Sequence, residues 1–203
     1  MWASRWGVAN SSGTFKYTDF VHHALVEGRS ENGVFAARVM WGTLGEMVEK
    51  LAPILASERD VADIDVLHRA FGRIRFIYLF REDVLAQAVS WSRAEQTNVW
   101  YETIDGGDAH AEAHARFDRT EIDELLSLIE EQNRAWQDWF GAADIRPYEV
   151  RYEVLERDPR ITTCGVLDYL GLELAPGRAI EIRHRRLADR VNMEWIARYR
   201  TGT

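Results

Sequence analysis

The chain has 203 residues, 46% of them hydrophobic and 29% charged, which suits one sizeable soluble globular domain. Its formal net charge of −8 argues against a general nucleic-acid-binding protein, which needs a basic face. No apolar run is long enough to span a bilayer and the N-terminus lacks a signal-peptide pattern, so we expect a cytoplasmic protein without membrane insertion.

The N-terminal part is predicted to combine short helices with one strand. Residues 1–16 are polar and are expected to be irregular. A short helix is expected from about Thr18 to Gly28, and Gly33 to Met40 has the pattern of a buried strand. The next helix is predicted from an apolar repeat at i, i+3, i+4 and i+7, formed by Leu44, Met47, Val48 and Leu51.

The clearest strand covers residues 74–80, which are β-branched and aromatic almost without interruption. Such a run is typical of an interior parallel strand that is covered on both faces. Arg81 follows it directly, and an amphipathic helix is expected from about Asp83. This strand, turn and helix form the first half of a βαβ unit.

The remaining elements continue the alternation of helices and strands. Residues 104–118 resemble a loop, a long helix is expected from Thr120, and Tyr148 to Tyr152 is predicted to be a strand. Another helix near 160–170 should end at Gly171 and bury the single cysteine, Cys164, as an inert thiol. The pattern predicts an α/β fold with a mostly parallel sheet between two layers of helices.

Arg81 is the strongest candidate for binding an anion. Ligands favour the carboxyl ends of strands in such sheets, and the N-terminus of the following helix offers backbone N–H groups. Arginine adds a bidentate fork that matches a phosphate. The competing interpretation is a surface salt bridge with Glu82 or Glu95. On the following helix one face is shared by Gln87, Ser90, Trp91 and Ala94.

The segment FIYLFREDVLAQAVSWSRAEQTNVW at residues 76–100 resembles bacterial PAPS-dependent sulfotransferases of the trehalose 2-sulfotransferase type. Three other blocks support the resemblance, which spans roughly residues 30–200. They are Asn32–Phe35 with Met40–Trp41, Val150–Leu155, and Arg185–Asp189 with Trp195 and Arg198–Arg200. The resemblance implies a P-loop NTPase-like sulfotransferase fold in a single domain over residues 1–203.

The resemblance also implies roles for individual residues in binding PAPS, the sulfuryl donor. Arg81 and Ser90 correspond to the residues that bind its 3′-phosphate, and Tyr152 to a position that often contacts the adenine. Arg185 and Arg186 are candidates for a second phosphate contact. For Tyr152 the alternative is an ordinary half-buried tyrosine, and for the two arginines a solvated basic run.

The acceptor implied by the family is a carbohydrate hydroxyl of a trehalose-like sugar or glycolipid, as in sulfolipid biosynthesis. Arg38 stands where the family pattern has lysine, and Trp41 and Trp100 are candidates for bordering the sugar pocket. Core packing is the other explanation for the tryptophans. The chain holds eight of them, which suits both a ring-bearing ligand and a dimer contact, and the family implies a homodimer.

The expected phosphosulfate-binding strand and loop are not recognisable before residue 33, so we expect an N-terminally incomplete fold with weak or no activity on its own. No catalytic base is assigned. A non-catalytic module for PAP binding or dimerisation is the alternative function, and a P-loop kinase is disfavoured because the Walker sequence is missing. His110 and His114 lack the H-E-x-x-H arrangement, and we expect no metal.

Overall fold

The computed structural model describes residues 17–55, 61–100, 102–103, 115–182, 184–185 and 190–202. The chain divides into two compact units, Met1–Ile74 and Arg75–Thr203. The predictions for residues 1–16, for His110 and His114 and for Arg186 concern positions outside the described residues. The expectation of one domain over the whole chain stays a prediction.

The described part of the first unit is built from three helices. They are α2 (Tyr17–Glu27), α3 (Trp41–Leu55) and α4 (Asp63–Phe71). The apolar repeat predicted for α3 is confirmed, because Leu44, Val48 and Leu51 are all buried. Helix α4 was not predicted; it contributes Val66 and Leu67 to the buried residues and packs against α3.

The prediction of a buried strand from Gly33 to Met40 is wrong. The structure has no strand at these positions, and most of their side chains are exposed. A strand requires a neighbour to pair its backbone groups, and the described residues of this unit contain no other strand. Phe35 instead stacks on Phe71 at 6.5 Å between ring centroids, which joins this segment to α4.

Gly28, just after α2, is expected to resist even a methyl group. A Cβ atom there would lie 2.7 Å from the backbone oxygen of Ala24 and 2.8 Å from the Phe35 ring. We expect Gly28→Ala to destabilise the protein by about 1–3 kcal/mol, the usual cost of overpacking. Gly45→Ala is the matched control, because it adds a methyl group in open space on α3 and should stabilise by about 0.5–1 kcal/mol. Urea unfolding checks both values, and equal effects would contradict the account.

The second unit alternates helices with short strands. Its elements are β1 (Ile77–Phe80), α5 (Val84–Thr97), β2 (Glu102–Thr103), α6 (Arg119–Ala142), β3 (Tyr148–Arg151), α7 (Tyr152–Arg157), α8 (Pro159–Leu170), β4 (His184–Arg185) and α9 (Arg190–Thr201). The helices predicted from about Asp83, from Thr120 and near 160–170 are confirmed, as is the stop at Gly171. Gly171 adopts a left-handed conformation with φ of 70°.

β1 and β3 form a parallel pair, in which Ile77 is opposite Tyr148 and Phe80 is opposite Arg151. This confirms the strand, turn and helix predicted around residues 74–83. The prediction of an interior strand is not met, since among the described residues β1 pairs only with β3. An α/β unit with a small parallel sheet is therefore established.

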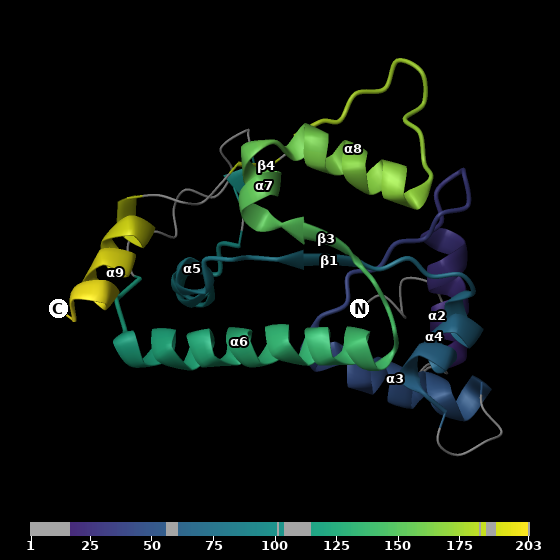
Figure 1. Ribbon diagram of the computed structural model, residues 1–203, viewed down its shortest axis with the longest axis horizontal. Coiled ribbons are helices and arrows are strands. Elements are labelled where there is room, and N and C mark those ends of the chain that lie inside the picture. The colour runs from purple at the N-terminus through teal and green to yellow at the C-terminus, as the bar shows by residue number, and fades with distance from the viewer. Residues whose placement is uncertain are drawn as a thin grey trace, which may run out of the picture. The chain divides into compact units, whose positions relative to one another are not determined.

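The two faces of this sheet are covered by different helices, α6 on one side and α8 on the other (Figure 1). Tyr78 is buried against α6, and Tyr148 packs on Tyr169 of α8. Ile77 and Leu79 share the face of Tyr148 but are 41% and 55% exposed. The expectation that residues 74–80 are covered on both faces is therefore wrong for these two, because α8 packs over β3 rather than over β1.

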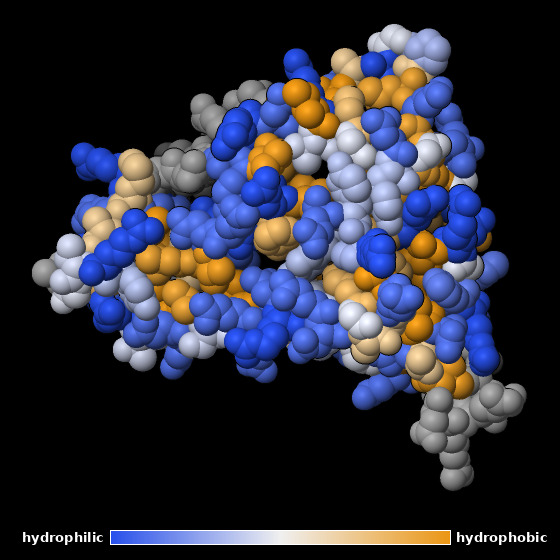
Figure 2. Space-filling view, viewed as in Figure 1, coloured by the Kyte–Doolittle hydropathy of each residue, from blue (hydrophilic) through white to orange (hydrophobic). Residues whose placement is uncertain are grey.

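A separate apolar cluster joins α5, α6 and α9. Its buried members are Ala88, Val89, Ile122, Ile129 and Trp195. Figure 2 shows hydrophilic residues along the outer side of α6 and hydrophobic residues between α6 and the elements α5 and α9. The cluster holds α5 in place, and with it the turn that joins β1 to this helix.

Cys164 was expected to be buried, and it is exposed. α8 turns Gly165 and Tyr169 toward Tyr148, and a Cβ atom on Gly165 would collide with the Tyr148 hydroxyl. Cys164 lies on another side of the helix and does not share this contact. Within the described ranges, no helix combines the length and the apolar character needed to cross a membrane.

Candidate functional site

The candidate site lies where β1 and β3 end. Because the strands are parallel and Phe80 pairs with Arg151, the residues that follow them emerge at the same edge of the sheet. Arg81 follows β1, and Tyr152 and Glu153 follow β3 as the first residues of α7. The structure therefore brings Arg81 and Tyr152 together, as predicted for two residues of one site.

Arg81 is held between an aromatic ring and a carboxylate. Its guanidinium lies 4.7 Å from the centre of the Tyr152 ring, and its Nε lies 3.9 Å from Glu153 Oε1. The side chain is only 17% exposed, yet Nε has no hydrogen-bond partner among the described residues. A buried guanidinium N–H without an acceptor is costly, so it favours an anionic ligand.

Glu153 is bound to the turn that starts α5. Its carboxylate accepts hydrogen bonds from the backbone N–H groups of Glu82, at 3.1 Å, and Asp83, at 3.2 Å. Burial alone would raise the pKa of this carboxyl, but backbone hydrogen bonds and the nearby Arg81 charge outweigh it and hold the pKa below its ordinary value. Glu153 is therefore ionised at neutral pH.

Three backbone donors around the start of α5 are already used by carboxylates of the protein itself. Asp83 caps the helix by accepting from the N–H of Ala86 at 2.9 Å, while Glu153 accepts from Glu82 and Asp83. The sequence predicted that backbone N–H groups here bind a phosphate, but these three bind carboxylates of the protein instead. An external anion at this edge therefore does not have these three donors available.

The alternative partners weighed for Arg81 are engaged elsewhere. Glu82 binds Arg151 at 3.0 Å on the surface, and Glu95 accepts from the indole N–H of Trp91 at 3.0 Å. The ion pair of Arg81 is with Glu153, which lies at the carboxyl edge of the sheet. Arg81 can therefore form this ion pair and still bind a ligand at the edge of the sheet.

The face of α5 predicted from Gln87, Ser90, Trp91 and Ala94 is present on the helix. Gln87 carries a second buried polar atom without a partner, its acceptor Oε1. Ser90 is half-buried one turn further along. Gln87 was not singled out as a site residue, and its unpaired acceptor suits a ligand hydroxyl.

The other proposed phosphate contacts are only partly described. Arg185 lies in β4, whose backbone pairs antiparallel with β2 so that Arg185 is opposite Glu102. The side chain of Arg185 and the whole of Arg186 are outside the described residues. Their role in phosphate binding stays a prediction.

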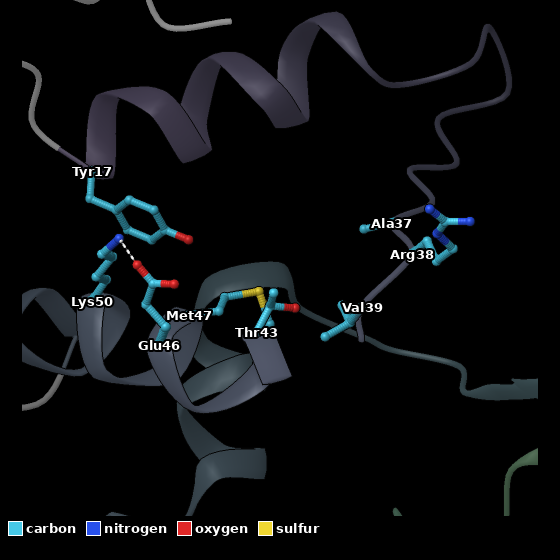
Figure 3. A pocket seen from close by; sticks show the side chains of 8 residues that line it. All are labelled: Tyr17, Ala37, Arg38, Val39, Thr43, Glu46, Met47 and Lys50. Carbon is cyan, nitrogen blue, oxygen red and sulfur yellow. Dashed lines mark hydrogen bonds and ion pairs between the residues drawn. The ribbon is translucent and has the colours of Figure 1, made fainter. Parts of the chain in front are cut away.

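The first unit contains an open cavity of about 240 Å³ beside α3 (Figure 3). It is lined by Tyr17, Ala37, Arg38, Val39, Thr43, Glu46, Met47 and Lys50. Figure 3 shows the Tyr17 ring near the Lys50–Glu46 ion pair at one end and Arg38 at the other. Arg38 is thus placed beside a cavity with charged and hydroxyl groups.

The two candidate tryptophans differ in burial. Trp41, the first residue of α3, is half-buried and is not part of the cavity lining. Trp100 is 53% exposed, so packing in the core does not explain it. Within the described ranges, no group of three or more His, Cys, Asp or Glu side chains is placed to hold a metal ion.

Besides Gln87, sequence reasoning missed Glu153. The signal was available, because Glu153 directly follows the predicted strand Tyr148 to Tyr152, and the sheet was predicted to be mostly parallel. Residues after neighbouring parallel strands meet at one edge. The same reasoning that placed Arg81 there also places Glu153 there.

Comparison with known proteins identifies the family of the chain. The family described as Stf0 sulphotransferase matches residues 1–202, so the match includes the first 29 residues, which the sequence resemblance did not cover. A trehalose 2-sulfotransferase of Mycobacterium tuberculosis, strain Erdman, is 29% identical, with 88% of this chain and 65% of the relative covered. A trehalose 2-sulfotransferase of Mycolicibacterium smegmatis is 33% identical, with 85% and 63% covered.

The chain thus spans just under two thirds of the length of these curated relatives. The family match covers nearly all of the 203 residues, including both compact units. The chain therefore belongs to the Stf0 sulphotransferase family.

Proposed function

We propose that the protein transfers a sulfuryl group from PAPS to a hydroxyl group of a trehalose-like sugar or glycolipid. Arg81 and Ser90 bind the 3′-phosphate of the donor in this proposal. The support is the family membership together with the trehalose 2-sulfotransferase names of both relatives.

One structural observation carries the proposal, namely the buried Nε of Arg81 without a hydrogen-bond partner. The group lies at the carboxyl edge of a parallel sheet, where ligands of such folds bind. A phosphate supplies the acceptors that this guanidinium lacks, and Gln87 Oε1 offers an acceptor for a nearby hydroxyl. The residues present therefore fit a nucleotide that carries a phosphate.

The remaining residues take secondary parts. Tyr152 contacts the adenine, while Arg185 and Arg186 add a second phosphate contact. Arg38 binds the acceptor sugar, and Trp41 and Trp100 border it. Sugars bind to aromatic faces and to groups that form hydrogen bonds. Each within its own unit, the exposed ring of Trp100 offers the first and the cavity beside Arg38 offers the second.

The reaction forms a bond between the acceptor oxygen and sulfur and breaks the bond between sulfur and the bridging oxygen of the donor. PAP leaves, and the acceptor hydroxyl gives its proton to a base. We assign no residue of this chain to that role. Cationic and N–H groups stabilise the spread negative charge in such an in-line displacement. Arg81 contributes by fixing the donor rather than by contacting the sulfuryl group.

The proposal extends to the fold and the assembly. The finer architecture is a three-layer, P-loop NTPase-like sheet to which β1 and β3 belong, with α6 and α8 from the two flanking layers. A homodimer in the cytoplasm is the expected state. These features follow the family pattern and stay predictions.

Transfer of labelled sulfate from PAPS to trehalose tests the proposed function. We expect measurable transfer to trehalose, because the family membership and the names of both relatives support sulfuryl transfer to this sugar. Sucrose, a disaccharide of the same size, is the control acceptor and should gain less label. PAP binding without any transfer would favour a non-catalytic PAP-binding module. Absence of both would overturn the proposal.

A further inference from the structure

Glu153 contacts both the turn before α5 and the side chain of Arg81. Its Oε1 accepts from the backbone N–H groups of Glu82 and Asp83 at 3.1 and 3.2 Å and also lies 3.9 Å from Arg81 Nε. The side chain is 31% exposed, so the carboxylate is partly shielded from water. One oxygen thus faces two backbone dipoles and one guanidinium.

We propose that Glu153 is a positioning residue, whose charge holds the Arg81 guanidinium against the Tyr152 ring and presents its free donors to a phosphate. This inference rests on the proposed function for the identity of the phosphate. It assigns to Glu153 no contact with the reacting atoms.

Two features of the geometry support a positioning role. The carboxylate occupies the N–H groups of Glu82 and Asp83, just before α5, so these two donors are not free for a phosphate, whereas the Nε of Arg81 has no partner. The 3.9 Å separation is an ion-pair distance and not a hydrogen bond, so Nε keeps its donor for another acceptor. Charge attraction fixes the guanidinium without using up its donors.

Charged residues from β1, the turn after it and β3 surround the Arg81–Glu153 pair. Arg81 comes from the end of β1, Glu82 and Asp83 from the following turn, and Arg151 from the end of β3, where it pairs with Glu82. Asp83 is committed to capping α5. Glu153 is therefore the carboxylate that pairs with Arg81 in the described residues.

Glu153→Gln removes the negative charge of this side chain but keeps an oxygen that can accept the hydrogen bonds. The amide oxygen of glutamine can still accept from the N–H groups of Glu82 and Asp83, but the negative charge beside Arg81 is lost. Glu149→Gln is the matched control, because it removes the same charge from an exposed position on β3. Thermal unfolding should show both variants folded, with similar midpoints.

Two readouts then test the role of the charge. The first is the exchange with solvent of the Arg81 Nε–H proton, followed by NMR and assigned with Arg81→Lys. It should become roughly tenfold faster in Glu153→Gln and stay unchanged in Glu149→Gln. The second is calorimetric titration with PAP, in which Glu153→Gln should weaken binding roughly 3–10-fold.

The outcomes distinguish this inference from the proposed function. An unchanged rate of Nε–H exchange in Glu153→Gln would overturn the positioning role, whatever the affinity of this variant for PAP. Tighter PAP binding in that variant would also overturn it, because the carboxylate would then compete with the phosphate. If the wild-type protein binds no PAP, the proposed function fails, and the exchange measurement alone decides the role of Glu153.

Discussion

Replacement of Arg81 by alanine is expected to weaken PAP binding by roughly 10–100-fold. A hydrogen bond to a charged group contributes about 1.5–3 kcal/mol, and about 1.4 kcal/mol corresponds to a factor of ten in affinity. Arg81 is buried at the edge of the sheet with an unpaired Nε, so water replaces it poorly. Isothermal titration calorimetry with PAP measures the change.

Arg146→Ala is the matched control for this experiment. Arg146 is exposed and precedes β3, so it lies at the opposite end of the strand from the candidate site. Its loss changes the net charge equally and should leave PAP affinity within about twofold, because exposed charges are strongly screened. Equal losses in the two variants would mean that Arg81 acts only through the net charge.

Ile122→Ala is expected to destabilise the protein by about 2–5 kcal/mol, the usual range for a large cavity in a core. Ile122 is fully buried in the cluster that joins α5, α6 and α9. Its truncation leaves a cavity in the cluster that also contains Val89 and Trp195. The midpoint of urea unfolding, followed by tryptophan fluorescence, measures the loss.

Leu128→Ala on the same helix provides the comparison. Leu128 is 38% exposed, and alanine is at least as good a helix former as leucine. The cost should stay below about 1 kcal/mol, since much of the side chain is in water in both states. A loss as large as that of Ile122→Ala would show that burial in this cluster does not decide stability.

The second unit was largely predictable because its signals are local. The apolar run before Arg81, the capping Asp83 and the glycine at 171 each act within a few residues, and the observed elements follow them. The family resemblance was equally local, since its main segment at residues 76–100 includes β1 and α5. The parallel pairing followed from the alternation of strands and helices.

The errors concern contacts between distant residues. The apolar segment from Gly33 to Met40 was predicted to be a strand, but strand formation depends on a partner that a local pattern does not reveal. Leu79 and Cys164 were predicted to be buried from the apolar residues around them, but both are exposed. Sequence patterns show which face of a helix is apolar, but not which other element packs against that face.

The candidate site was predicted in part for the same reason. Arg81 and Tyr152 were identified, and the structure brings them together. The hydrogen bonds that Glu153 accepts from the N–H groups of Glu82 and Asp83 were not predicted. They occupy backbone donors that the sequence analysis had assigned to a phosphate. Such competition between an internal carboxylate and a ligand becomes visible only when the chain is folded.

The most direct test of the central claim compares PAP with adenosine 5′-monophosphate, which lacks the 3′-phosphate, on the wild-type protein and on Arg81→Ala. The account predicts that the wild type binds PAP at least about tenfold more tightly, because Arg81 adds a charged hydrogen bond to that phosphate. In Arg81→Ala the two affinities should become nearly equal. The same preference for PAP in both proteins, or no binding of PAP to the wild type, would contradict the account.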